Sequence, residues 1–172
     1  MTRLGDNGDR MARLAASIRS EIDRLVAVVA EAELALRDFS KSAPPLRELR
    51  GIGDIVHDFY TGIERIFEKI APELNGGVPA GSAWHRELLE SMALDLPTIR
   101  PPVIGRETVR ILGEYLRFRH LFRNVYGFEL EWERLQPLLA RLPATSVAFQ
   151  TDILRFLAFL DEASIHAAAR VP

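Results

Sequence analysis

The stretch GIGDIVHDFYTGIERIFEKIAP, residues 51–72, decides the fold class of this chain. Its large apolar residues recur every three or four positions: Ile52, Val56, Phe59, Ile63, Ile66 and Ile70. This is the spacing of one face of an α-helix, whereas a half-buried strand would alternate apolar and polar residues. Pro72 ends the pattern because proline lacks the backbone N–H of a helix interior. The stretch therefore predicts an amphipathic helix that packs its apolar face against other elements.

The same periodicity extends over most of the chain on either side of this stretch. Prolines or glycines separate the periodic segments, and strand signals are scarce. Ser82 is suited to capping the third segment, and Pro143 separates the last two. We expect helices over residues 10–39, 52–71, 82–92, 106–126, 131–142 and 145–169. The sequence thus predicts an all-α, antiparallel bundle of about five to six helices.

Length and composition are those of one globular domain. The chain has 172 residues, 48% of them hydrophobic, and a formal net charge of -2. We expect a single domain over residues 1–172. Its first nine residues are polar and glycine-rich, so we expect residues 1–9 to be disordered.

The cysteine count and the hydropathy pattern exclude several protein classes. The chain has no cysteine, which rules out disulfides, thiol nucleophiles and cysteine-ligated zinc. No apolar run reaches the ~18 residues of a membrane span, and the first ten residues do not show the charged and then apolar pattern of a secretory leader. We therefore expect a soluble, cytoplasmic protein without a membrane partner.

Positive charge is concentrated in the segment 106–126. This segment carries a net charge of +3 and leaves -5 for the rest of the chain. With about 100° of rotation per residue, its polar residues gather in an arc of roughly 160°. They are Arg119, His120, Arg123, Asn124 and Tyr126, with Ile111, Phe118, Leu121, Phe122 and Val125 on the opposite side.

Two interpretations of this arc stay open. The simpler interpretation is a solvated helix face, because charged stripes are common on surface helices. Against it, Arg117, Arg119 and Arg123 largely lack acidic residues one helical turn away. Arginine is also the side chain best suited to bidentate contacts with phosphate. The second interpretation is therefore an RNA-binding surface.

The stretch RHLFRNVY, residues 119–126, resembles the signature of HEPN ribonucleases of the HepT-like toxin group. That signature reads Arg, four residues, His, one residue, Tyr, so Arg119 and Tyr126 match it directly. The flanking blocks HDFYTGIERIFEKIA (57–71), GSAWHRELLESM (81–92), LDLPTIRPPVI (94–104) and YGFELEWERLQPLL (126–139) resemble the same family in the same order. The resemblance covers about residues 50–142.

The resemblance implies metal-independent RNA cleavage, in which the ribose 2′-hydroxyl attacks the adjacent phosphate. Arg119 would stabilise the charge on the phosphoryl oxygens, with Arg117 and Arg123 binding RNA. The family's catalytic His falls on Asn124, which cannot transfer a proton, so the activity would be weakened. His120 lies one turn earlier, and we expect it to replace that histidine with Asn124 orienting its imidazole.

The family resemblance also implies partners. These are a second copy of the chain in a symmetric dimer and a nucleotidyltransferase antitoxin. In some members the antitoxin transfers AMP to the motif tyrosine, here Tyr126. The alternative function is a non-enzymatic interaction module that binds a partner protein or nucleotide through the Arg119 face, which Asn124 favours.

A metal site is the remaining chemical alternative. His57, Thr61 and Glu64 follow one another on the second predicted helix, and with His85 they offer nitrogen and oxygen ligands. A polar helix face explains them equally well, because no pair of histidines lies one turn apart. We expect no metal and no cofactor.

Overall fold

The computed structural model describes residues 3–124 and 130–169 and confirms the all-α prediction. Within these ranges the chain forms five helices and no strand. The helices are α1 (Arg3–Asp38), α2 (Leu46–Leu74), α3 (Trp84–Ser91), α4 (Arg106–Phe122) and α5 (Trp132–Ala168). None of them is long and apolar enough to cross a membrane.

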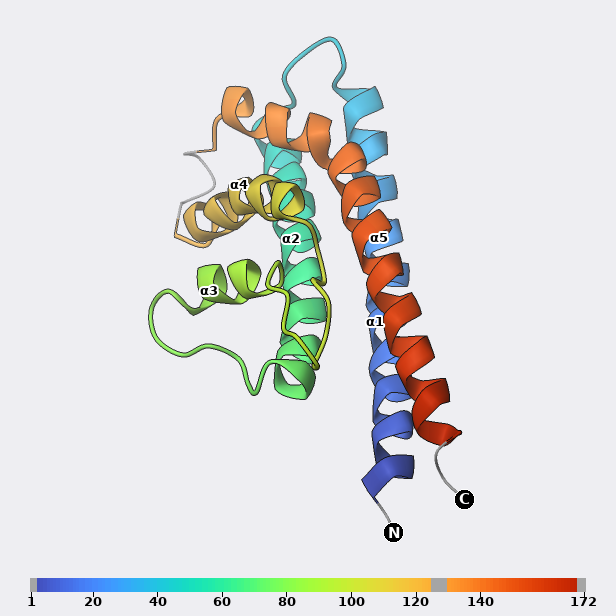
Figure 1. Cartoon of the computed structure of the whole chain (residues 1–172). Coiled ribbons are helices and arrows are strands. Elements are labelled where there is room, and N and C mark those ends of the chain that lie inside the picture. Colours follow the sequence, from blue (N-terminus) through green and yellow to red (C-terminus); the bar gives the residue numbers. More distant parts are fainter. Residues whose placement is uncertain (1–2, 125–129, 170–172) are drawn as a thin grey trace.

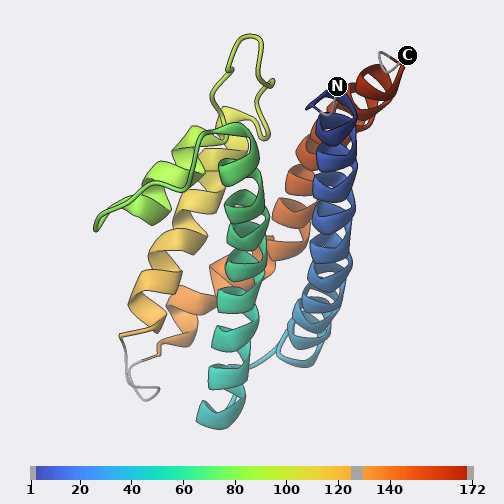
Figure 2. The ribbon, with the colours of Figure 1, turned by 90° about the horizontal axis from the view of Figure 1, so that it is seen from below.

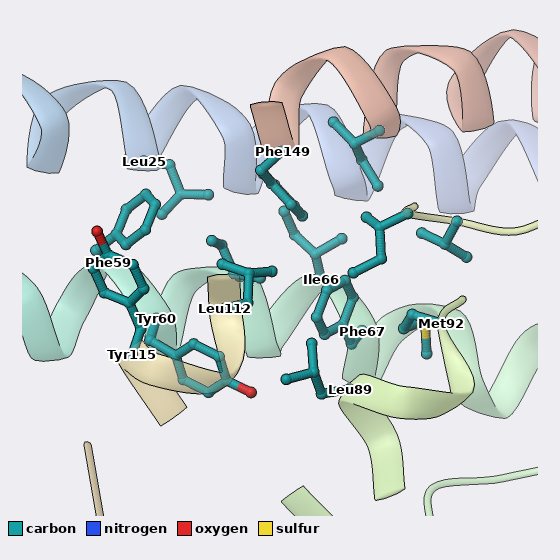
Figure 3. Packing of buried hydrophobic residues seen from close by; sticks show 14 of the residues in the cluster. Leu25, Phe59, Tyr60, Ile66, Phe67, Leu89, Met92, Leu112, Tyr115 and Phe149 are labelled. Carbon is teal, nitrogen blue, oxygen red and sulfur yellow. The ribbon is translucent and has the colours of Figure 1, made fainter. Parts of the chain in front are cut away.

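Helix α2 is the centre of the bundle. Figures 1 and 2 show α1 and the long part of α5 side by side and antiparallel, with α2 between this pair and the smaller helices α3 and α4. The stripe that predicted α2 is fully buried, and Tyr60 and Phe67 beside it are buried as well. Figure 3 shows their rings among side chains from the other helices. Helix α2 continues past Pro72 to Leu74, because burial of Ile70 and Ala71 in the same turn outweighs the one hydrogen bond that Pro72 removes.

The last predicted boundary was wrong, because α5 is one continuous helix. Pro143 lies inside it, and Figure 1 shows α5 bending between its first turns and its long remainder. Proline removes one N–H donor, yet buried Leu139 and Leu142 hold this turn against the core. Thr145 Oγ1 also donates to the Arg141 carbonyl at 2.9 Å. Core packing therefore makes the helix bend rather than end.

Helix α1 begins at Arg3, earlier than the apolar stripe predicted. Ser164 Oγ on α5 donates to the Gly8 carbonyl at 3.0 Å. A Cβ atom on Gly8 would lie 3.3 Å from the Cβ of Ala167, so the two helices approach closely here. Contact with the end of α5 thus accounts for helix in residues of low intrinsic helix propensity.

Two polar contacts fix α4 and α3, which carry the candidate site. Asp152 of α5 accepts hydrogen bonds from Gly105 N at 2.9 Å and Thr108 Oγ1 at 2.5 Å, so it caps the first turn of α4. Arg100 is buried in the connecting loop and donates to the carbonyls of Ser91 and Leu94. Helix α3 begins after Ala83, so Ser82 is not its N-cap.

Candidate functional site

Arg119 is buried, contrary to the predicted exposed arc. Only 8% of the residue is accessible to solvent. It shares the buried face of α4 with Leu112, Tyr115 and Leu116. On a helical wheel these three residues lie within about 60° of Arg119. The apolar spacing of the segment therefore already indicated that Arg119 shares the buried face. Arg119 therefore points towards α2 and α3 instead of into solvent.

The charge of Arg119 is compensated by Glu64 of α2. Arg119 Nη2 lies 3.0 Å from Glu64 Oε1, and 3% of Glu64 is exposed. The expectation that no acid compensates this arginine was therefore wrong, because the partner comes from another helix. Burial raises the pKa of Glu64, and the positive charge of Arg119 opposes that shift.

His85 of α3 completes a closed network with these two residues. Its Nδ1 lies 2.7 Å from Glu64 Oε2, and its Nε2 lies 3.3 Å from Arg119 Nη1. A guanidinium only donates, so Nε2 must carry a lone pair and Nδ1 the proton. The geometry thus selects the neutral imidazole. Burial, then the charges of Arg119 and Arg123, lower the pKa of His85, while Glu68 opposes them.

The indole of Trp84 covers one face of His85. The two ring centroids are 3.6 Å apart with 29° between the planes. In this position the indole limits how the imidazole can turn. The network therefore joins three helices, with Glu64 on α2, His85 on α3 and Arg119 on α4.

His120 lies at the solvent edge of this network. Its ring meets His85 edge to face, with centroids 5.3 Å apart. Burial, then the neighbouring His85 and Arg119, lower the pKa of His120, whereas Glu64 opposes that shift. An exposed imidazole of lowered pKa is neutral at pH 7 and can accept a proton.

The remaining motif residues lie at the end of α4. The helix stops at Phe122, and Arg123 and Asn124 form an exposed turn. Asn124 Nδ2 donates to the His120 backbone carbonyl at 2.8 Å, so it does not orient the His120 imidazole as predicted. Arg117 is exposed on α4. Tyr126, the predicted modification site, lies outside the described residues.

The described residues do not form the alternative metal site. His57 Nδ1 lies 3.3 Å from Asp58, and its ring packs on Phe122 with centroids 5.5 Å apart. Among the described residues no three His, Cys, Asp or Glu side chains gather as metal ligands. Of the four residues considered, Glu64 and His85 hydrogen-bond to each other, and both contact Arg119.

A groove of ≈ 590 Å³ opens beside the two histidines, between α3 and α4. His85 and His120 lie at one end of it, and Leu89 and Leu116 line its apolar part. Its charged lining consists of three arginines, Arg86, Arg110 and Arg117, and one acid, Glu90. The site thus combines neutral imidazoles, a buried cation and an arginine-lined groove.

Residues 51–160 match the HepT-like protein family, and this range covers α3, α4 and most of α2 and α5. The chain belongs to the HepT-like family of HEPN proteins. The match contains every residue of the network and the whole groove. No curated protein and no solved structure matches the chain.

The sequence singled out Arg119, His120 and the family resemblance, but not the link of Arg119 to Glu64 and His85. Glu64 and His85 were weighed only as metal ligands or as part of a polar helix face. The signal available was burial: Glu64 follows Ile63 and precedes Ile66 in the stripe of α2, and an acid at that position needs a cationic partner.

Proposed function

We propose that this HepT-like protein is a metal-independent RNA endonuclease with His120 as its proton-transfer residue. The observation that carries the proposal is the exposed imidazole of His120, whose ring meets His85 where His85 contacts the buried guanidinium of Arg119. The groove supports the same function, because its arginines are suited to phosphate.

The reaction needs only groups that the chain supplies. His120 takes the proton of a ribose 2′-hydroxyl, whose oxygen then attacks the adjacent phosphorus. The bond from phosphorus to the 5′ oxygen breaks, leaving a 2′,3′-cyclic phosphate and a 5′-hydroxyl end. The departing 5′ oxygen takes up a proton, which the imidazolium formed on His120 in the first step returns directly or through a water molecule.

Arg119 has a positioning role in this mechanism. Its guanidinium is held by Glu64 and His85 and keeps a positive charge behind the reacting groups. Direct contacts with RNA phosphates fall to the exposed Arg117 and Arg123. This division differs from the sequence expectation, in which Arg119 itself reached the phosphate.

Asn124 favours a second candidate function, a non-enzymatic module. The family's catalytic His is absent at this position, and the Asn124 side chain instead donates a hydrogen bond to the His120 carbonyl at the end of α4. In this alternative the arginine-rich face binds a partner protein or nucleotide without turnover. Cleavage assays separate the two candidates.

We further propose a two-fold homodimer that brings the ends of two α4 helices together. Leu121 supports it, since this large apolar side chain is 62% exposed next to His120.

A nucleotidyltransferase antitoxin that modifies Tyr126 stays a proposal from the family resemblance. Intact mass after co-expression would reveal such an adduct and its loss in Tyr126→Phe.

The function is tested by incubating RNA and DNA oligonucleotides of one sequence with the protein in EDTA. We expect RNA products ending in 2′,3′-cyclic phosphate and intact DNA, because DNA lacks the attacking 2′-hydroxyl. Uncut RNA at stoichiometric protein concentration would favour the non-enzymatic module.

A further inference from the structure

The groove between α3 and α4 follows α4 over much of its length. The α4 residues that line it recur at helical spacing: Val109, Arg110, Gly113, Leu116, Arg117 and His120. These residues span about 16 Å at 1.5 Å per residue. The opposite wall comes from α3 and the residues before it, including Ser82 and Arg86. The groove is therefore elongated and ends at the proposed proton-transfer residue.

Positive charge predominates along this groove. Arg110 is paired with Glu107 on the exposed helix surface, and Arg86 lies 4.0 Å from Glu90. Arg117 has no acidic partner within residues 3–124 and 130–169. The surface ion pairs of Arg110 and Arg86 are weak, so each arginine can exchange its acidic partner for a phosphate.

Gly113 keeps the middle of the groove open. A Cβ atom built on it would meet nothing within 4 Å, so the space above this turn of α4 is empty. The neighbouring wall is apolar, formed by Val109, Leu89 and Leu116. A glycine here lowers helix stability relative to alanine, and it leaves room for a ligand against the helix backbone.

We propose that this groove binds the single-stranded RNA segment next to the cleaved bond. Arg110 and Arg117 contact successive phosphates, and bases or riboses lie on the apolar wall beside Gly113. Charge complementarity favours a polyanion, and the apolar wall favours one that carries flat, partly apolar groups. The inference rests on the proposed ribonuclease function, but its test does not need turnover.

The test measures binding of a 2′-O-methyl RNA oligonucleotide, which has no attacking hydroxyl and cannot be cleaved. The variant Gly113→Phe fills the groove with a side chain. Gly51→Phe is the matched control, because Gly51 is also a helical glycine with nothing within 4 Å of a Cβ, and it lies on α2 outside the groove. We expect at least tenfold weaker binding for Gly113→Phe and unchanged binding for Gly51→Phe, with circular dichroism showing helical folds for both.

A second variant tests the phosphate contacts. Arg110→Gln combined with Arg117→Gln should reduce the slope of log affinity against log salt by about 1.4, because each contact to a single strand contributes about 0.7. Unchanged binding by folded Gly113→Phe, or an unchanged salt slope, would overturn the proposal. So would tighter binding of poly-glutamate than of the oligonucleotide, which would indicate an acidic protein as the ligand.

The outcomes separate this inference from the function on which it rests. If wild type cleaves RNA while Gly113→Phe binds and cleaves normally, the groove is not the RNA site and the ribonuclease function stands. If wild type binds RNA through the groove but never cleaves it, the groove stands and the ribonuclease function fails.

Discussion

Arg119 of α4 lies 3.0 Å from Glu64 of α2, and both residues are buried. The motif arginine is therefore part of the core as well as of the candidate site. Its second contact, with His85, connects this ion pair to the groove. Loss of activity in an Arg119 variant must accordingly be separated from loss of folding.

Replacing Arg119 by alanine should lower the free energy of unfolding by about 3–5 kcal/mol, because the buried carboxylate of Glu64 loses its partner. Urea denaturation checks this. The double variant Glu64→Gln, Arg119→Met removes both charges and should recover part of the loss. A single variant as stable as wild type would contradict the buried pair.

The imidazoles of His85 and His120 should titrate with pKa values below the ordinary His value of about 6.5, since burial and nearby cations disfavour their charged forms. The unfolded chain then binds more protons below pH 6.5, so stability should fall as the pH drops through that value. Proton NMR titration assigned with His85→Gln and His120→Gln measures both groups. Midpoints at or above 6.5 would disprove the lowered values.

The dimer should depend on Leu121. We expect sedimentation at micromolar concentration to show a dimer for wild type and a monomer for Leu121→Lys, which places a charge in the proposed interface. Val147→Lys is the control, because Val147 is similarly exposed, at 65%, on α5. A monomeric wild type, or a dimeric Leu121→Lys, would show that this surface does not join two copies.

Restoring the family's histidine should raise cleavage. Asn124→His supplies a titratable group where Asn124 has only an amide, and general acid–base catalysis is worth about 10²- to 10⁴-fold. We expect an increase of about 10²-fold in the initial rate on the same RNA. Asn124→Gln, whose amide also does not titrate near neutral pH, should keep the wild-type rate. No gain for Asn124→His would mean that the family's role does not map onto this position.

The sequence predicted most of the fold because apolar periodicity and prolines act locally. The buried stripe of α2 and the start of α4 at Arg106 followed directly from spacing. Pro143 misled the prediction because packing of Leu139 and Leu142 against the core outweighs the loss of one hydrogen bond. Local signals could not weigh that tertiary contribution.

The candidate site was only partly predictable for a related reason. The wheel placed Arg119 and His120 in one polar arc, but exposure depends on which helices pack around α4. Glu64 and His85 lie 55 and 34 residues from Arg119, so no local spacing connects them. Only the bundle brings these residues together.

The rate of RNA cleavage in EDTA by wild type and His120→Gln is the most direct test of the proposed function. His120 is exposed at the edge of the network, so glutamine in its place should leave the fold intact while it removes the proton acceptor. Arg134→Gln serves as the surface control, because Arg134 is exposed on the first turn of α5 and does not line the groove. We predict measurable cleavage by wild type and the control, and a loss of about 10²-fold or more for His120→Gln. Equal rates for wild type and a folded His120→Gln would contradict the account.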